Sequence, residues 1–206
     1  PNKIIAEHEA INRSSACFSF NRKDQFEEFS TESWEQWIDN TASLFIQSSP
    51  SIAISASSAV SDKHNHMKMS LFPLALALSV AMSRSNPLWS ELFKRIFTSS
   101  NIPPLIVRLF LSAIEFLEIV HIDPLPVSYE LLATSAMNSG MTVMALRYTE
   151  FNFLVNPVKF SEQLIRLNQK LGMTMSANGV LRYLKNEAFM TTNKILKPKS
   201  NCSFKN

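Results

Sequence analysis

The residues best suited to chemistry in this sequence are two histidines, His64 and His66, on either side of a single asparagine. Asp62 lies two residues before the first of them. Imidazole and carboxylate groups bind zinc, but a protein zinc site needs three or four ligands. No other histidine or cysteine lies near this stretch in the sequence. We therefore expect a solvated loop here and no metal site.

The motifs that carry catalysis are absent from the sequence. It contains no glycine-rich phosphate loop, no G-x-S-x-G turn, no H-E-x-x-H pair and no H-R-D or D-F-G motif. Trp34 and Trp37 are three residues apart, which favours packing in a helical core over a ligand cage. We expect no catalytic, cofactor-binding or metal-binding residue in this chain. One further interpretation is an all-helical enzyme with an unfamiliar site, but no cluster of residues in the sequence supports it.

The cysteines and the charged residues argue against a disulfide-bonded protein and against a nucleic-acid-binding protein. Cys17 and Cys202 lie near opposite ends, so they indicate reduced thiols rather than a disulfide framework. The formal charge is +3, but four lysines follow Glu187 with no acidic residue after it. No predicted helix carries a basic stripe, so we expect no nucleic-acid partner. Charged residues make up only 18% of the chain. This low share indicates apolar surface that something outside the chain covers.

The apolar spacing predicts a succession of helices. Apolar residues recur three and four positions apart, whereas strict alternation and glycine turn pairs are scarce. The predicted helices span about 31–47, 51–60, 71–82, 87–97, 103–120, 128–138, 141–153, 156–171 and 173–184. Polar or proline-containing breaks separate them, including residues 61–68 and 121–127. The most apolar run, residues 71–82, is far shorter than the roughly 20 residues that span a bilayer. We expect a buried helix there and no transmembrane segment.

One face of each predicted helix should be buried. In the first helix this face comprises Trp34, Trp37, Ile38, Thr41, Leu44 and Phe45. In the helix over 103–120 it comprises Leu105, Ile106, Leu109, Phe110, Ala113, Phe116, Leu117 and Val120. In the last three helices it comprises Met141, Met144, Ala145, Tyr148, Phe151, Leu164, Leu167, Leu171, Met173, Ala177, Val180 and Leu184.

A short pattern occurs twice in the last third of the chain. Gly140 is followed by Met-Thr and then by Ala145, and the same pattern recurs 32 residues later from Gly172 to Ala177. Glycine adopts the left-handed backbone conformation that ends a helix, and a small alanine lets two helices approach closely. The offset is near the 34-residue period of tetratricopeptide (TPR) repeats. We therefore predict two helical hairpins in one register, although two unrelated hairpins would give a similar pattern.

The order of motifs resembles that of the target-of-rapamycin (TOR) kinases of the PI3K-related family, where HEAT repeats give way to the FAT domain. The similar segments are "STESWEQWIDNTASLFIQSSPSI", "SLFPLALALSVAM", "IVRLFLSAIEFLEIV", "DPLPV", "LLATSAMNSGMTVMALRYTEFNF", "SEQLIRLNQKL" and "ANGVLRYL". They cover about residues 30–187. The resemblance implies an all-α solenoid of antiparallel hairpins. Its parts would be a leader or linker (1–30), a HEAT-like segment (31–122), TPR-like hairpins that begin the FAT domain (123–190), and a basic, disordered tail (191–206).

The resemblance also implies a function. It indicates a non-catalytic scaffold segment of a serine/threonine kinase, whose ATP and magnesium would bind only in the parent's kinase domain. The implied partners are the rest of the kinase, adaptor subunits and a small GTPase. The implied location is the cytoplasm, with the nucleus and a membrane periphery as further sites of the complex. A basic end without further repeats suggests a truncated product or a divergent terminus. The alternative is a self-standing TPR-like adaptor that binds a protein partner.

Overall fold

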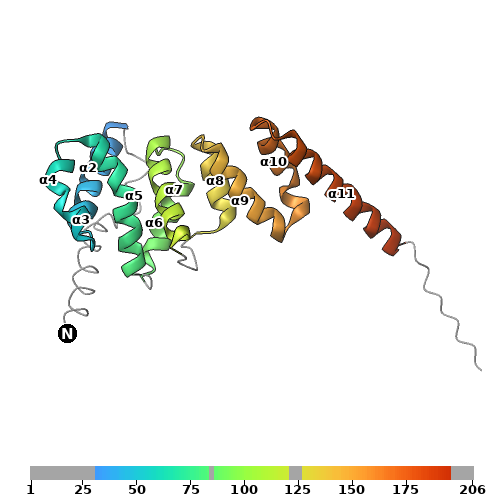
Figure 1. Cartoon of the computed structure of the whole chain (residues 1–206), viewed down its shortest axis with the longest axis horizontal. Coiled ribbons are helices and arrows are strands. Elements are labelled where there is room, and N and C mark those ends of the chain that lie inside the picture. The colour runs from blue at the N-terminus through green and yellow to red at the C-terminus, as the bar shows by residue number, and fades with distance from the viewer. Residues whose placement is uncertain (1–30, 84–85, 121–126, 196–206) are drawn as a thin grey trace, which may run out of the picture. The chain divides into compact units, whose positions relative to one another are not determined.

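The computed structural model describes residues 31–83, 86–120 and 127–195. These residues form ten helices and no strand, which confirms the predicted all-α class (Figure 1). The expected leader over 1–30, most of the expected break over 121–127, and residues 196–206 of the expected tail lie outside the described part. The chain divides into two compact units, Pro1–Met141 and Thr142–Asn206.

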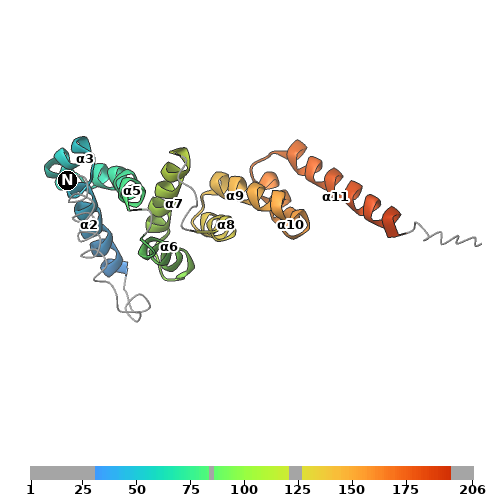
Figure 2. The same ribbon diagram turned by 90° about the horizontal axis from the view of Figure 1, so that it is seen from below.

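The first unit contains seven of the described helices. They are α2 (Thr31–Gln47), α3 (Ile52–Ala56), α4 (Ser58–Ser61), α5 (Asn65–Met82), α6 (Leu88–Thr98), α7 (Pro104–Ile119) and α8 (Tyr129–Asn138). Within this unit α5 packs against both α2 and α7, and α8 contacts both α6 and α7 (Figure 2). Helices that neighbour one another in space therefore cover one another's apolar faces, as in a helical-repeat protein.

An aromatic cluster fills the centre of the first unit. The ring of Phe110 on α7 lies 6.4 Å from that of Trp37 on α2, 5.6 Å from Phe72 on α5 and 5.7 Å from Phe93 on α6. Phe110, Phe72 and Phe93 are completely buried. Edge-to-face aromatic pairs add about 0.5–1.5 kcal/mol beyond the area they bury. One side chain thus joins four helices, and the tryptophan pair belongs to the core as predicted.

Three sequence-based expectations about the first unit are wrong in detail. The predicted helix over 51–60 is two short helices, α3 and α4, on either side of Ser57. The predicted polar break over 61–68 ends early, because α5 already begins at Asn65. Leu44, Leu105 and Val120 were expected in the core but are about half exposed. The buried side of α2 holds Ala42 and Ile46 rather than Leu44. Leu105 lies in the first turn of α7.

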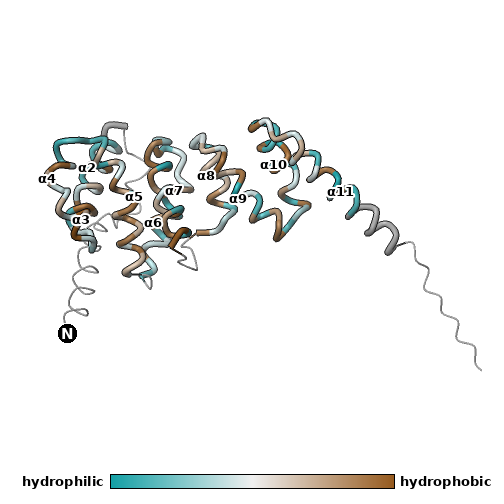
Figure 3. Tube along the Cα trace, in the orientation of Figure 1, coloured by the Kyte–Doolittle hydropathy of each residue, from teal (hydrophilic) through white to brown (hydrophobic). Residues whose placement is uncertain are grey.

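The predicted buried helix over 71–82 is confirmed as the apolar part of α5. Pro73 lies within α5, where it removes one backbone hydrogen bond. Its ring is itself buried, so the apolar area that it covers offsets part of that loss. Figure 3 shows α5 and α7 mostly in the brown of apolar residues.

The second unit contains α9 (Thr142–Val155), α10 (Pro157–Lys170) and α11 (Thr174–Ile195). Here α10 packs against both α9 and α11, and the rings of Phe153 and Tyr183 lie 5.6 Å apart. The expected inward residues Leu164, Leu167 and Ala177 are buried. The hairpin predicted around Gly172 is therefore confirmed. α11 continues to Ile195, past the end expected near residue 184.

Two inward predictions for the last three helices are also wrong. Phe151 and Met173 are more than one-third exposed. Phe151 lies one turn before the end of α9, and Met173 lies in the turn before α11. Side chains at the ends of paired helices lie outside the contact between the helices. The spacing of apolar residues does not predict where along each helix that contact ends.

The glycines at 140 and 172 end their helices with the same geometry. Their φ angles are +80° and +73°. In each turn the glycine N–H donates to the carbonyl three residues back, at 3.1 and 3.0 Å. The N–H of the following methionine donates to the carbonyl five residues back, at 2.8 Å in both turns. This is the Schellman pattern, which satisfies carbonyls at a helix end. The predicted glycine stops are confirmed.

We expect alanine to have opposite effects at two glycines of the second unit. No atom lies within 4 Å of a Cβ added to Gly172 or to Gly179, so neither substitution causes a clash. Gly172→Ala should lower the free energy of unfolding by about 1 kcal/mol, because it puts an L-residue at positive φ. Gly179→Ala should raise it by about 0.5–1 kcal/mol, because Gly179 lies inside a helix. Urea denaturation of both variants would check this, and shifts of the same sign would contradict it.

Candidate functional site

The histidines singled out in the sequence lie at the start of α5. His64 precedes the helix and His66 lies in its first turn, and both side chains are exposed. Within residues 31–83, 86–120 and 127–195, no three His, Cys, Asp or Glu side chains lie close enough together to hold a metal ion. The expected loop is wrong at His66, whose side chain is nevertheless solvated as expected.

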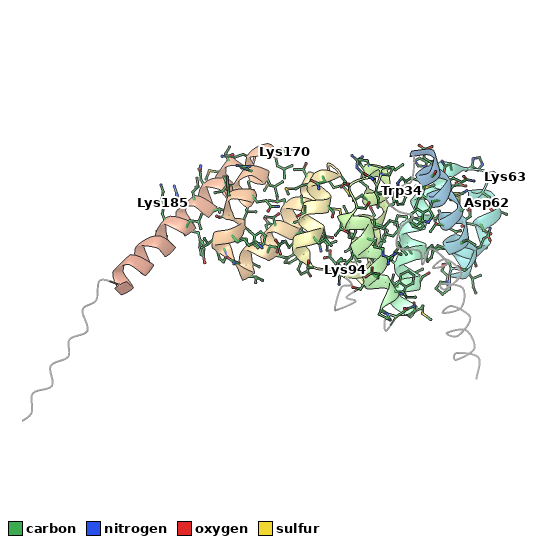
Figure 4. All side chains as sticks on the ribbon, turned by 180° about the vertical axis from the view of Figure 1, so that it is seen from behind. Trp34, Asp62, Lys63, Lys94, Lys170 and Lys185 are labelled. Carbon is green, nitrogen blue, oxygen red and sulfur yellow. The ribbon has the colours of Figure 1, made fainter. Side chains whose placement is uncertain are left out.

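A buried lysine lies close to these histidines. Lys68 Nζ donates to Asp39 Oδ1 at 2.7 Å and lies 3.9 Å from Asp62 Oδ1. Ser43 Oγ donates to the same Asp62 oxygen at 2.9 Å. The side chain of Lys68 is only 6% exposed, whereas those of the two aspartates are 45% and 42% exposed. The cluster joins α2, the end of α4 and α5; Asp62 is labelled in Figure 4.

The charges of this cluster suit a structural role. Two carboxylates lie around one ammonium, with oxygen atoms at 2.7 and 3.9 Å, so the charges of the cluster are paired with one another. An ammonium removed from water is tolerated only when it is paired and hydrogen-bonded. Nothing in the sequence pattern indicated this cluster, because Lys68 lies in a stretch that is typical of a polar loop.

A second polar contact fixes the end of α8. Arg108 Nε on α7 donates to the backbone carbonyl of Ser139 at 2.7 Å. A Cβ added to Gly140 would lie 3.3 Å from Nη2 of the same arginine. A guanidinium at a helix C-terminus complements the negative end of the helix dipole. The glycine turn therefore also leaves room for the side chain that caps α8.

The described surface offers apolar contacts in addition to charged ones. On the first unit the most exposed large apolar side chain is Ile52. On the second unit Leu154, Val155 and Val158 flank the turn between α9 and α10, with exposed fractions of 77%, 86% and 81%. Exposed apolar groups of this kind are typical of contacts with other proteins.

The outer face of α11 is the part of this helix that points away from α10. Ala177 is buried on the inner side. The outer face is defined by residues spaced three and four apart, all of them exposed, namely Met175, Asn178, Gly179, Arg182, Lys185 and Asn186. Among the described residues it is an uncovered helix face.

We expect the buried lysine to be a sensitive point of the first unit. Asp39→Ala should lower the free energy of unfolding by about 2 kcal/mol, because it leaves a buried ammonium without its nearest partner. Adding Lys68→Met should recover part of the loss, since no buried charge then remains. Urea denaturation would measure both effects.

Glu91→Ala provides the matched control for this experiment. It breaks the more exposed Arg95–Glu91 pair of the same unit, in which the nitrogen and oxygen are 2.9 Å apart. An i,i+4 pair of this kind contributes about 0.3–0.5 kcal/mol. Equal losses in Asp39→Ala and Glu91→Ala would contradict a structural role for the buried lysine.

No helix in the described part of the chain is long and apolar enough to cross a membrane. No protein-family model matches the sequence.

Comparison with curated proteins gives consistent relatives. The chain is 30% identical over 162 residues to the serine/threonine-protein kinase mTor of Drosophila melanogaster, a match that covers 77% of this chain. It is 30% identical over 157 residues to TOR2 of Saccharomyces cerevisiae and 29% identical over 163 residues to TOR of Oryza sativa, each covering 74% of this chain. The matches span about 6% of the length of each relative. By sequence, this chain is therefore the counterpart of one short segment of the target-of-rapamycin serine/threonine kinases.

Proposed function

We propose that this chain acts as a non-catalytic helical scaffold segment of a TOR-type serine/threonine kinase. The observation that carries the proposal is the extent of the similarity, since 30% identity extends over 77% of this chain. A match that long covers most of the chain and not only one motif. A self-standing adaptor is less favoured, because the relatives at this level of similarity are kinases.

The packing of the first unit suits a scaffold. The ring of Phe110 contacts aromatic rings on α2, α5 and α6. The salt bridge between Lys68 and Asp39 connects α5 to α2. Close-packed protein interiors have low compressibility and transmit strain. A rigid set of helices can therefore hold other parts of a large kinase at fixed positions.

The rest of the proposal concerns context. The kinase parent would supply ATP and magnesium binding and the catalytic residues. The segment would contact the rest of that kinase, and its exposed apolar residues would offer surface to adaptor subunits and to a small GTPase. It would work in the cytoplasm, in growth and nutrient signalling.

A chimeric kinase tests the scaffold role. Residues 31–195 of this chain would replace the matching segment of Saccharomyces cerevisiae TOR2, and peptide phosphorylation by the purified chimera would be measured. We expect a rate within about tenfold of the parent, which corresponds to about 1.4 kcal/mol in the activation barrier. The same assay on this chain alone should show no phosphate transfer.

Two control chimeras show whether the fold itself is needed. One carries Phe110→Asp, which buries an unpaired charge in the aromatic cluster and should cost more than about 4 kcal/mol of stability. The other carries a glycine-serine linker of equal length. Both should lose activity. The scaffold proposal would be refuted if the chimera with unaltered residues 31–195 were inactive, or if the chimera with the linker were fully active.

A further inference from the structure

The outer face of α11 lacks any covering element among the described residues. Met175, on this face, is 83% exposed. The inner side, by contrast, holds Ala177 buried, and Tyr183 on its flank contacts Phe153. One side of the helix is thus used in packing within the unit and the other side is free.

Gly179 lies at the middle of this free face and has no packing role among the described residues. Its backbone is helical rather than left-handed, and no atom lies within 4 Å of the position of its missing Cβ. Glycine inside a helix costs about 0.5–1 kcal/mol relative to alanine. What it provides is access, because a second backbone can approach closely where no side chain intervenes. The spacing between packed helices depends on the side chains at their contact.

The charge on this face has one sign. Between Thr174 and Asn186, α11 carries Arg182 and Lys185 and no acidic residue. Lys170, at the end of α10, adds a third exposed cation near the start of α11. Figure 4 shows Lys170 at the turn between the two helices and Lys185 farther along α11. Complementary charge favours a negatively charged partner and disfavours a second copy of this face.

We propose that the outer face of α11 docks an amphipathic helix whose packing stripe is flanked by acidic residues, supplied by polypeptide outside these 206 residues. The partner helix crosses close to α11 at Gly179, Met175 packs against its apolar stripe, and its carboxylates face Arg182 and Lys185. This inference rests on the proposed scaffold function, for which it specifies the chemistry of one contact.

A helix fits these observations better than the other anionic partners. Nucleic-acid binding rests on phosphate contacts from many cations, whereas this face has two and a third nearby. A helix that lies on an anionic membrane presents bulky apolar groups to the lipid. The centre of this face is instead a glycine that follows an asparagine, Asn178, which suits close contact with another backbone.

Two synthetic peptides test the proposal on the full chain. Each has about 20 residues, enough to form a helix. Both have leucine and alanine along one face, and this face is flanked by glutamate in one peptide and by lysine in the other. Fluorescence anisotropy should show the glutamate peptide binding at least tenfold more tightly, a difference of about 1.4 kcal/mol. Arg182→Glu together with Lys185→Glu should reverse that preference.

Gly179→Leu is the decisive variant. Leucine favours the helix more than glycine does, so weaker binding cannot be ascribed to unfolding. We expect it to weaken binding of the glutamate peptide at least tenfold, by about 1.4 kcal/mol. Ser176→Leu, at an exposed position on a different side of α11, should leave the affinity unchanged.

Several results would overturn the docking proposal. They are equal binding of the two peptides, no binding of either at about 1 mM, unchanged affinity in Gly179→Leu, and preferential binding of phosphatidylserine vesicles. These results are separable from a failure of the scaffold proposal. An active chimera without peptide binding removes only the docking site, and peptide binding with an inactive chimera removes only the scaffold role.

Discussion

The first unit depends on one buried ring more than on any other group. Phe110 is completely buried and lies within 6.4 Å of aromatic rings on α2, α5 and α6. Because those three helices begin as far apart in the chain as Thr31 and Leu88, their relative positions depend on long-range contacts. The hydrogen bonds of each helix fix only its own backbone. Truncation of a buried phenylalanine typically costs 3–5 kcal/mol, which is a large share of the stability of a domain.

The second unit is built differently. Its buried core combines the aromatic Tyr148 with aliphatic residues such as Leu164 and Leu167 and with the small Ala177. Its order comes largely from how the helices stop and start. Asn156 Oδ1 accepts the Lys159 N–H at 3.2 Å at the start of α10, and the Gly172 turn ends that helix. Such a unit has less apolar area to bury on itself, which is consistent with its highly exposed Leu154 and Val158.

The sequence predicted the helices well because its signals were local. Near the start of a helix, a side-chain oxygen of Asn86, Ser128 or Asn156 accepts a backbone N–H, which is typical of asparagine and serine at such positions. Helices end at Gly140 and Gly172 because these glycines adopt a positive φ. Prediction failed where the environment of a residue depends on a partner far away in the sequence. Lys68 reads as a loop residue unless Asp39, 29 positions away, is known to lie beside it.

Limits of the same kind apply to the candidate docking site. A glycine inside an apolar pattern reads as a weakness of the helix or as its end, so Gly179 had no interpretation from sequence alone. The structure distinguishes it from Gly172, because the two have equally open surroundings but only Gly172 has a positive φ. At Gly172 the backbone explains the residue. At Gly179 neither backbone nor packing within the described chain does, and the remaining physical reason for a missing side chain is the approach of something from outside. That reasoning applies to a helix face on which, from Met175 to Asn186, cations occur without acids, which is why Gly179 and the charge pattern point to the same partner.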